Sequence, residues 1–183
     1  MPKSTVVKAE LQVSDMDRHY YATHNLVLAQ HPSETDERLM VRLLAFALHA
    51  DERLEFGRGL SDEEEPALWR RDYSGDIELW IEVGNPDESR IRKACARARE
   101  VVVLNYGGRA SDLWWEKAAG TLSRLKNLTV LALPAEVPPR LAAMGGRGMR
   151  LNALVQDGEL QLMGDEASLA IRPAVRMSST SGA

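Results

Sequence analysis

The chain has 183 residues, of which 44% are hydrophobic and 27% are charged, and its formal net charge is −4. These values are typical of one soluble globular domain, and no apolar run approaches the roughly 20 residues that a membrane-spanning helix needs, which excludes such a helix. The negative balance excludes a surface that attracts nucleic acid everywhere by charge, but it allows a local basic groove.

The cysteine content and the first residues indicate the compartment. Cys95 is the single cysteine, so it can form neither an internal disulfide nor a cysteine-based zinc site, in agreement with a reducing compartment. The first residues show no basic region followed by an apolar segment, which is the pattern of a secretory signal. We therefore expect a cytoplasmic monomer that does not bind membranes, in which Cys95 acts as a small buried hydrophobe.

The chain begins with the pattern of a β-hairpin. Apolar and polar residues alternate over residues 4–13, turn residues follow at 14–17, and residues 19–30 are again typical of a strand. The fold is therefore expected to open with two antiparallel strands.

A helix is predicted next, from about residue 34 to 50. Ser33 and Asp36 precede its apolar stripe in a pattern that resembles a capping box. Glu37 lies in the first turn, on or beside that stripe. Its charge either interacts favourably with the helix dipole or needs a partner.

The sharpest pattern is a strand predicted over residues 76–83, after a short strand at 67–71 and a hairpin turn at 73–75. Strict alternation divides its side chains between two faces. One face carries Ile77, Leu79, Ile81 and Val83, and the other carries Asp76, Glu78, Trp80 and Glu82. The second face is either a solvated or salt-bridged face or the lining of a metal site.

A basic helix is predicted directly after this strand. Asn85 as N-cap and Pro86 at the first helical position start a helix that runs to about residue 99. Its buried side carries Ile91, Ala94, Cys95 and Ala98, and its other side carries Arg90, Lys93 and Arg97. We expect Arg90 and Lys93 to lie near the acidic strand face.

The rest of the chain predicts a parallel crossover and further strands. Apolar runs at 101–104 and 129–133 are typical of central strands, and a helix capped by Ser111 connects them in a right-handed crossover. A short helix near 140–145 and strands at 150–155, 159–163 and 168–172 follow. We expect one domain over residues 1–175 and a disordered tail over 176–183.

The acidic strand face is the main candidate for chemistry. Same-face residues two apart on a strand lie about 6.5–7 Å apart, so neighbouring carboxylates could address one hard cation, whereas Asp76 and Glu82 lie farther apart. Clustered carboxylates repel one another unless a proton, a cation or a basic partner relieves the repulsion. A metal site and a salt-bridged face both satisfy this requirement.

Several strings in the chain closely resemble the YaeQ family of small bacterial proteins. They are SDMDRHYY at 14–21, HPSETDER at 31–38 and IELWIEVG at 77–84, with PDE at 86–88 and RIRKA at 90–94 behind them. The resemblance covers most of the chain and weakens after about Pro134. It implies a variant of the restriction-endonuclease-like PD-(D/E)xK fold, in which helices flank a mixed central sheet of an α/β domain.

The resemblance also implies where the site residues lie. The acid of the early helix corresponds to Glu37, and the strand acid of the acidic-x-lysine motif corresponds to Glu82. The second strand acid stays open among Glu65, Asp72, Asp76 and Glu78, with Asp76 taken as the metal ligand beside Glu82. The chain departs from the motif because Gly84 stands where the catalytic lysine belongs.

The function that the resemblance implies is a Mg²⁺-dependent nuclease acting on nucleic-acid phosphodiesters. Asp76 and Glu82 would hold the metal, which would lower the pKa of the attacking water. Lys93 would stabilise the developing phosphate charge, with Arg90 as a substrate contact or as the replacement for the missing lysine. Two alternatives stay open: a nucleic-acid-binding or regulatory module without catalysis, and a small-molecule enzyme that uses the same carboxylates.

Overall fold

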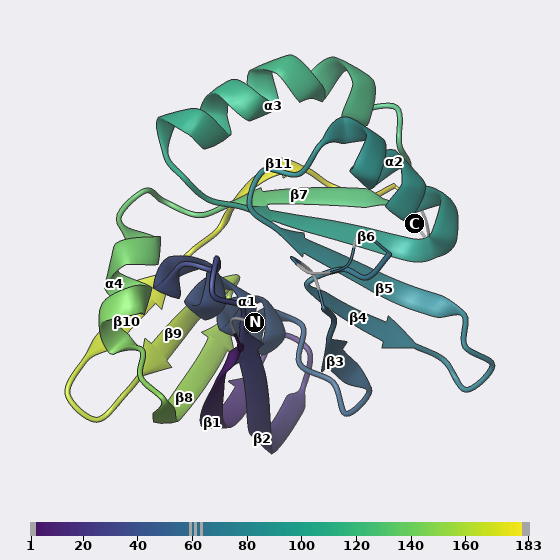
Figure 1. Ribbon diagram of the computed structural model, residues 1–183. Coiled ribbons are helices and arrows are strands. Elements are labelled where there is room, and N and C mark those ends of the chain that lie inside the picture. Colours follow the sequence, from purple (N-terminus) through teal and green to yellow (C-terminus); the bar gives the residue numbers. More distant parts are fainter. Residues whose placement is uncertain (1–2, 59, 61, 63, 181–183) are drawn as a thin grey trace. The chain divides into compact units, whose positions relative to one another are not determined.

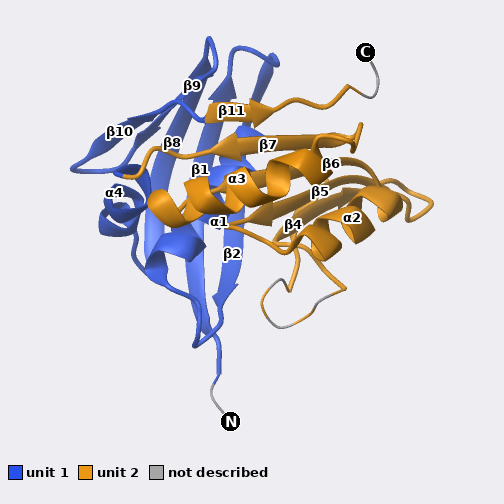
Figure 2. Cartoon of the chain, turned by 90° about the horizontal axis from the view of Figure 1, so that it is seen from above, with its two compact units in different colours: residues 1–50, 136–173 blue, residues 51–135, 174–183 orange. Residues whose placement is uncertain are grey.

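The computed structural model describes residues 3–58, 60, 62 and 64–180. The chain divides into two compact units, which Figure 2 colours separately. Unit 1 consists of residues 1–50 and 136–173, and unit 2 consists of residues 51–135 and 174–183. The predicted α/β class is confirmed, but the described strands form two sheets in place of one central sheet, with one sheet in each unit.

Unit 1 contains a five-stranded sheet in the order β10-β9-β8-β1-β2. Its strands are β1 (Thr5–Asp15), β2 (Tyr20–Gln30), β8 (Gly148–Gln156), β9 (Glu159–Met163) and β10 (Ser168–Ile171). The predicted amino-terminal hairpin is confirmed, because β1 and β2 pair antiparallel over their whole lengths. β8 joins the sheet parallel to β1, so the early hairpin and the late strands share one sheet.

Two helices belong to unit 1, α1 (Asp36–Leu48) and α4 (Val137–Met144). The N-cap of α1 is Thr35, whose hydroxyl accepts a hydrogen bond from the Arg38 N–H, so the prediction of a cap at Ser33 is wrong. Arg42 donates to the buried carboxylate of Glu34 and to the carbonyl of Ala29. These bonds fasten α1 to the end of β2.

Unit 2 contains a six-stranded sheet in the order β11-β7-β6-β5-β4-β3. Its strands are β3 (Leu54–Phe56), β4 (Leu68–Arg71), β5 (Ile77–Val83), β6 (Ala98–Asn105), β7 (Leu128–Ala132) and β11 (Ala174–Met177). β5, β6 and β7 run parallel to one another, which confirms the predicted crossover (Figure 1).

The helices α2 (Glu88–Arg97) and α3 (Arg109–Leu122) connect these parallel strands. Both pack on the same side of the sheet, where one hydrophobic cluster includes Ile91 of α2, Leu122 of α3 and Val103 of β6. Two predicted caps are wrong. The N-cap of α2 is Asp87 and not Asn85, and α3 begins after Gly108, so Ser111 lies inside its first turn.

The carboxyl-terminal segment is ordered further than predicted. Arg176 and Met177 belong to β11, and the Ser179 N–H donates to the Thr129 hydroxyl. The Arg176 guanidinium donates to the Asn105 side chain and to the hydroxyl and carbonyl oxygens of Ser111. The described part of the predicted disordered tail is therefore part of unit 2, and residues 181–183 lie outside the described residues.

Candidate functional site

Glu82 lies near the end of β5 and is only 4% exposed. Its Oε1 atom accepts a hydrogen bond from Trp80 Nε1 at 2.8 Å and one from Arg90 Nε at 3.0 Å. A carboxylate at this depth is stable in its charged form only when it is paired and hydrogen-bonded. The Glu82 charge is therefore balanced within unit 2 by the Arg90 side chain.

Arg90 reaches Glu82 from the first turns of α2. Its Nη2 atom also donates to the Glu65 carbonyl at 2.9 Å. One guanidinium thus connects β5, α2 and the segment before β4 through its fixed set of donors. Of the four candidates for a second strand acid, Glu65 is the one that shares a partner with Glu82, although through its backbone.

A hollow of about 410 Å³ lies over α2 beside this pair. Its charged and aromatic lining comprises Arg90, Lys93, Arg97, Glu64, Asp87 and Trp80. Lys93 and Arg97 are exposed, and the Arg97 guanidinium lies 5.0 Å from the Trp80 ring centroid. The hollow therefore combines three cations with two acids, above a tryptophan that Arg97 partly covers.

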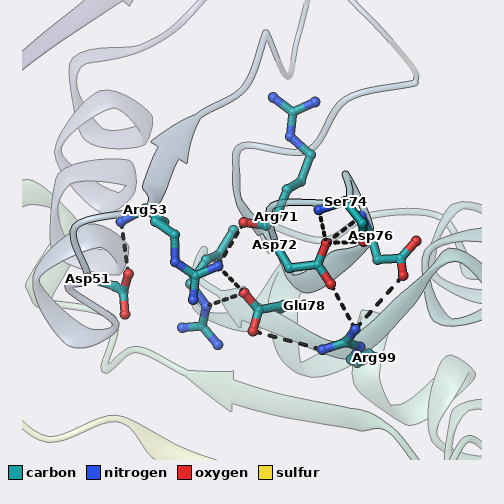
Figure 3. Close-up of polar contacts among 9 residues, drawn as sticks. Asp51, Arg53, Arg71, Asp72, Ser74, Asp76, Glu78 and Arg99 are labelled. Carbon is teal, nitrogen blue, oxygen red and sulfur yellow. Dashed lines mark hydrogen bonds and ion pairs between the residues drawn. The ribbon is translucent and has the colours of Figure 1, made fainter.

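A second charged cluster lies at the other end of β5 (Figure 3). The Glu78 side chain, 20% exposed, is hydrogen-bonded by Arg53. It also pairs with Arg70 at 3.7 Å and with Arg99 at 3.9 Å. These arginines come from three separate segments of unit 2, so Glu78 is surrounded by positive charge without being fully buried.

The β4–β5 hairpin adds Asp72 and Asp76 to this cluster. The Asp72 carboxylate accepts from the Ser74 hydroxyl and pairs with Arg99 at 2.9 Å. The pKa of Asp72 is below its usual value, chiefly because of the Ser74 hydroxyl, with the Asp76 and Ser74 N–H groups and the Arg99 charge acting in the same direction. The Asp76 side chain is 73% exposed and lies 3.9 Å from Arg99.

The carboxylates of β5 do not converge on one point. Glu78 and Glu82 are four residues apart along the strand, about 13 Å by its rise, with Trp80 between them on the same face. Asp76 precedes the strand and lies about 20 Å from Glu82 by the same measure. Mg²⁺ needs oxygen ligands at about 2.0–2.1 Å, so Asp76 and Glu82 do not fit the predicted metal site. Among the described residues, no group of three acidic, histidine or cysteine side chains could hold a metal ion.

The sequence-predicted residues therefore separate into three places. Arg90 and Lys93 line the hollow, and Glu82 is joined to it through Arg90 without lining it. Asp76 lies near Arg99, in the cluster around the β4–β5 hairpin. Glu37 is half-buried in the first turn of α1 in unit 1, and its participation stays a prediction. The acidic face of β5 is salt-bridged, as one of the two expectations allowed, but it is not solvated throughout, because Trp80 and Glu82 are both buried.

The sequence reasoning placed Arg90 near the acidic face of β5, but it missed the contact of Arg97 with Trp80 and the arginines that neutralise Glu78. Arg97 lies four residues after Lys93 and seven after Arg90, a helical spacing that predicts one surface but not its contact with Trp80. Arg53 and Arg99 come from other elements, and no local signal connects them with Glu78. Ile77 was expected on the same strand face as Leu79. It instead belongs to the hydrophobic cluster that contains Trp80, and the pairing of β4 with β5 shifts register next to Ile77.

Cys95 lies on α2 and is half-buried. Burial, with a smaller effect of the Glu100 charge, raises the pKa of its thiol to about 11. A thiol with this pKa is protonated at neutral pH and is a poor nucleophile, in agreement with its predicted structural role.

None of the described helices has the length and apolar character required to cross a membrane. The described side chains offer two arginine-paired acidic clusters and one basic hollow for interaction with other molecules.

Comparison with known proteins identifies relatives over nearly the whole chain. The family model described as "YaeQ protein" matches residues 1–173. The uncharacterised YaeQ protein of Escherichia coli K12 is 44% identical over 169 residues, which are 92% of this chain and 93% of that protein. The Salmonella typhi YaeQ protein is likewise 44% identical, over 93% of this chain and 94% of its own length.

Two crystal structures agree with this fold. The YaeQ protein from Xanthomonas axonopodis pv. citri is 60% identical with a TM-score of 0.93, covering 96% of this chain and 99% of that one. The YaeQ protein from Pseudomonas syringae is 35% identical with a TM-score of 0.92, covering 97% and 98% of the two chains. The similarity therefore includes both units.

Proposed function

This chain belongs to the YaeQ family, and we propose that it binds nucleic-acid phosphates on α2 without cutting the nucleic acid. The observation that carries the proposal is the concentration of positive charge on this helix. Four of its ten residues are basic, and its one acidic residue, Glu88, stands at the helix start. In a chain with a net charge of −4, this helix is a local basic surface.

The basic residues of α2 have two different roles, one structural and one in binding. Arg90 is engaged with Glu82 and the Glu65 carbonyl, and so it holds α2 against the sheet. Arg92 and Lys93 are exposed, and Arg97 is exposed although it pairs with Glu64 at 3.6 Å. Phosphate contacts by two or three cations are characteristic of weak, salt-sensitive binding that does not depend on sequence.

The pairing of the acids favours binding over cleavage. A catalytic metal would require Glu82 to turn an oxygen toward a second carboxylate, but the nearest acids along β5 are too far along the strand. Gly84 in the position of the motif lysine supports the same conclusion. The Mg²⁺-dependent nuclease is therefore the alternative against which the proposal is tested.

The binding test uses fluorescence anisotropy with labelled single-stranded and double-stranded DNA and RNA at several salt concentrations. We expect Kd values of about 10⁻⁴ to 10⁻⁶ M, and a log–log salt slope that falls by about 0.9 for each phosphate contact removed. The variant Arg92→Ala/Lys93→Ala should weaken binding and reduce this slope. The control is Lys117→Ala/Arg124→Ala, which removes two cations associated with the other helix of unit 2. Equal behaviour of the two variants would refute the proposed surface.

The cleavage test incubates the same substrates with Mg²⁺ or Mn²⁺. We expect intact substrates, and no rise in the melting temperature of the wild type with either metal. Cleavage that Glu82→Gln abolishes, while thermal stability is retained, would replace this proposal with the nuclease. A melting-temperature rise in the wild type that Glu82→Gln loses would point to the same revision.

A further inference from the structure

One of the four edge strands in the two sheets is much longer than the others. The order of the described strands leaves β10 and β2 at the edges of one sheet, and β11 and β3 at the edges of the other. Three of these edge strands have only three or four residues, whereas β2 has eleven. Short edge strands are one way in which proteins prevent association between sheets, and β2 lacks this protection.

The composition of β2 offers no other protection. Its sequence, YYATHNLVLAQ, contains no lysine, arginine, acidic residue, proline or glycine. Its pairing with β1 is continuous from Tyr20 to Gln30 without a bulge. Charges, prolines and bulges are the other devices that keep edge strands apart, so β2 is suited to pair with a further strand.

Exposed apolar side chains gather at the same hairpin. Among the described residues of unit 1, the large hydrophobic side chains that are exposed are Val6, Met16, Tyr21 and Val27. Tyr21 and Val27 lie on β2 itself and are 57% and 60% exposed. Val6 is on β1 opposite Ala29, and Met16 accepts a hydrogen bond from the Tyr21 hydroxyl. An apolar border to an open strand edge is typical of an association surface.

We propose that β2 pairs antiparallel with β2 of a second copy of this chain, around a twofold axis at Asn25. This axis sets Tyr21 opposite Ala29 of the partner subunit and Thr23 opposite Val27 of the partner subunit. The exposed Tyr21 and Met16 then meet the Val6 and Ala29 side of the other hairpin. The two five-stranded sheets become one continuous sheet, and the interface is isologous, as closed dimers require.

The partner is a second copy because β2 is complementary to itself. β2 contains no lysine, arginine or acidic side chain that would lie opposite the same charge in the partner subunit. The two Asn25 amides can hydrogen-bond to each other on the axis. On the face of β2 that is turned toward the core, the half-buried Ala22 lies beside Leu28 of the other strand, and the half-buried His24 lies beside its Leu26. Leu26 and Leu28 are buried. Arg42 already holds the Ala29 carbonyl, so the new ladder is centred on residues 23–27.

Sedimentation over a range of protein concentrations tests the dimer. We expect the wild type to associate in the micromolar range, because one strand pair buries a small interface. Thr23→Lys/Val27→Lys places a lysine at position 23 opposite a lysine at position 27 of the partner subunit, twice in the dimer. The repulsion should give a monomer. The control, Asn152→Lys/Gln161→Lys, adds the same charge at exposed positions on interior strands and should remain dimeric. A monomeric wild type, or equal association of both variants, would overturn the proposal.

A disulfide test determines the register independently of affinity. In a Cys95→Ser background, Asn25→Cys places two cysteines opposite each other on the axis, within the Cα separation of about 4.4–6.8 Å that a disulfide needs. Val27→Cys is the control, because its equivalent in the partner lies about 13 Å along the strand. Crosslinking of Asn25→Cys alone supports the axis. Failure of Asn25→Cys to crosslink, with thermal unfolding unchanged, contradicts it.

Discussion

Two glutamates on the same face of β5 show how burial changes the meaning of an ion pair. Glu82 is almost completely excluded from solvent and has one arginine partner, Arg90, together with the Trp80 indole. Glu78, four residues earlier, keeps some contact with water and has three arginine partners. The fully buried glutamate depends on two hydrogen bonds, whereas the half-buried one is hydrogen-bonded by Arg53 and lies near two further arginines.

The two glutamates differ in the free-energy cost of losing an arginine partner. A buried charge without its partner keeps the full cost of its removal from water, whereas an exposed charge recovers its hydration. The number of arginines around a carboxylate is therefore a poor guide to its contribution to stability. Substitutions at each glutamate test this difference.

The largest effect is expected at Glu82. Glu82→Ala leaves the Arg90 charge and the Trp80 N–H without their acceptor, and should lower the free energy of unfolding by about 3–5 kcal/mol. Glu78→Ala should lower it by no more than about 1 kcal/mol, because its surroundings are screened by solvent. Urea unfolding followed by circular dichroism measures both. Equal losses in the two variants would contradict the role assigned to burial.

A smaller net change is expected when both members of the buried pair are replaced. Glu82→Leu/Arg90→Met removes the two charges together and fills similar volume with apolar atoms, so most of the Glu82→Ala loss should be recovered. The same urea experiment gives the coupling when Glu82→Leu and Arg90→Met are each measured alone. Strict additivity of the single changes would show that Glu82 and Arg90 do not stabilise each other.

The smallest effect is expected at Asp72, in the exposed cluster. Its pKa in the folded chain is below the unfolded value of 3.8, because Ser74 hydrogen-bonds to the charged form. The stabilisation is therefore present above the unfolded pKa and is lost as the pH falls through the folded pKa. Asp72→Asn should lower the melting temperature slightly at pH 7, where this stabilisation is present, and less at acid pH, so that the acid side of the melting-temperature profile becomes flatter. An unchanged acid profile would mean that this hydrogen bond does not affect stability.

The periodic parts of the fold could be predicted from the sequence. The apolar run at 101–104 correctly indicated a covered central strand, and it became the middle of β6. The alternation from Val7 to Val13 correctly indicated β1. The N-cap residues of the helices were harder to predict. Asn85 and Asp87 are both good N-cap residues, and only the backbone conformation of the folded loop selects between them.

The candidate site was predictable only where its contacts are local along the chain. The spacing of Arg90, Lys93 and Arg97 on one helix placed them together before their contacts were known. The Arg53 and Arg99 contacts with Glu78 join segments that are distant in sequence, so no periodicity contains them. The burial of Glu82 had one signal, the neighbouring Trp80, which is too large and apolar for an ordinary solvated face.

The order of the strands along the chain has a consequence for biosynthesis. β7 has β6 on one side, but its other neighbour, β11, is translated only after β8, β9 and β10 of the first sheet. While the nascent chain lengthens, the backbone groups on that side of β7 are open to incorrect partners. Arg176, which ties β11 to Asn105 and Ser111, arrives with the same late segment. The edge strand β11 is thus synthesised more than forty residues after β7, the strand with which it pairs.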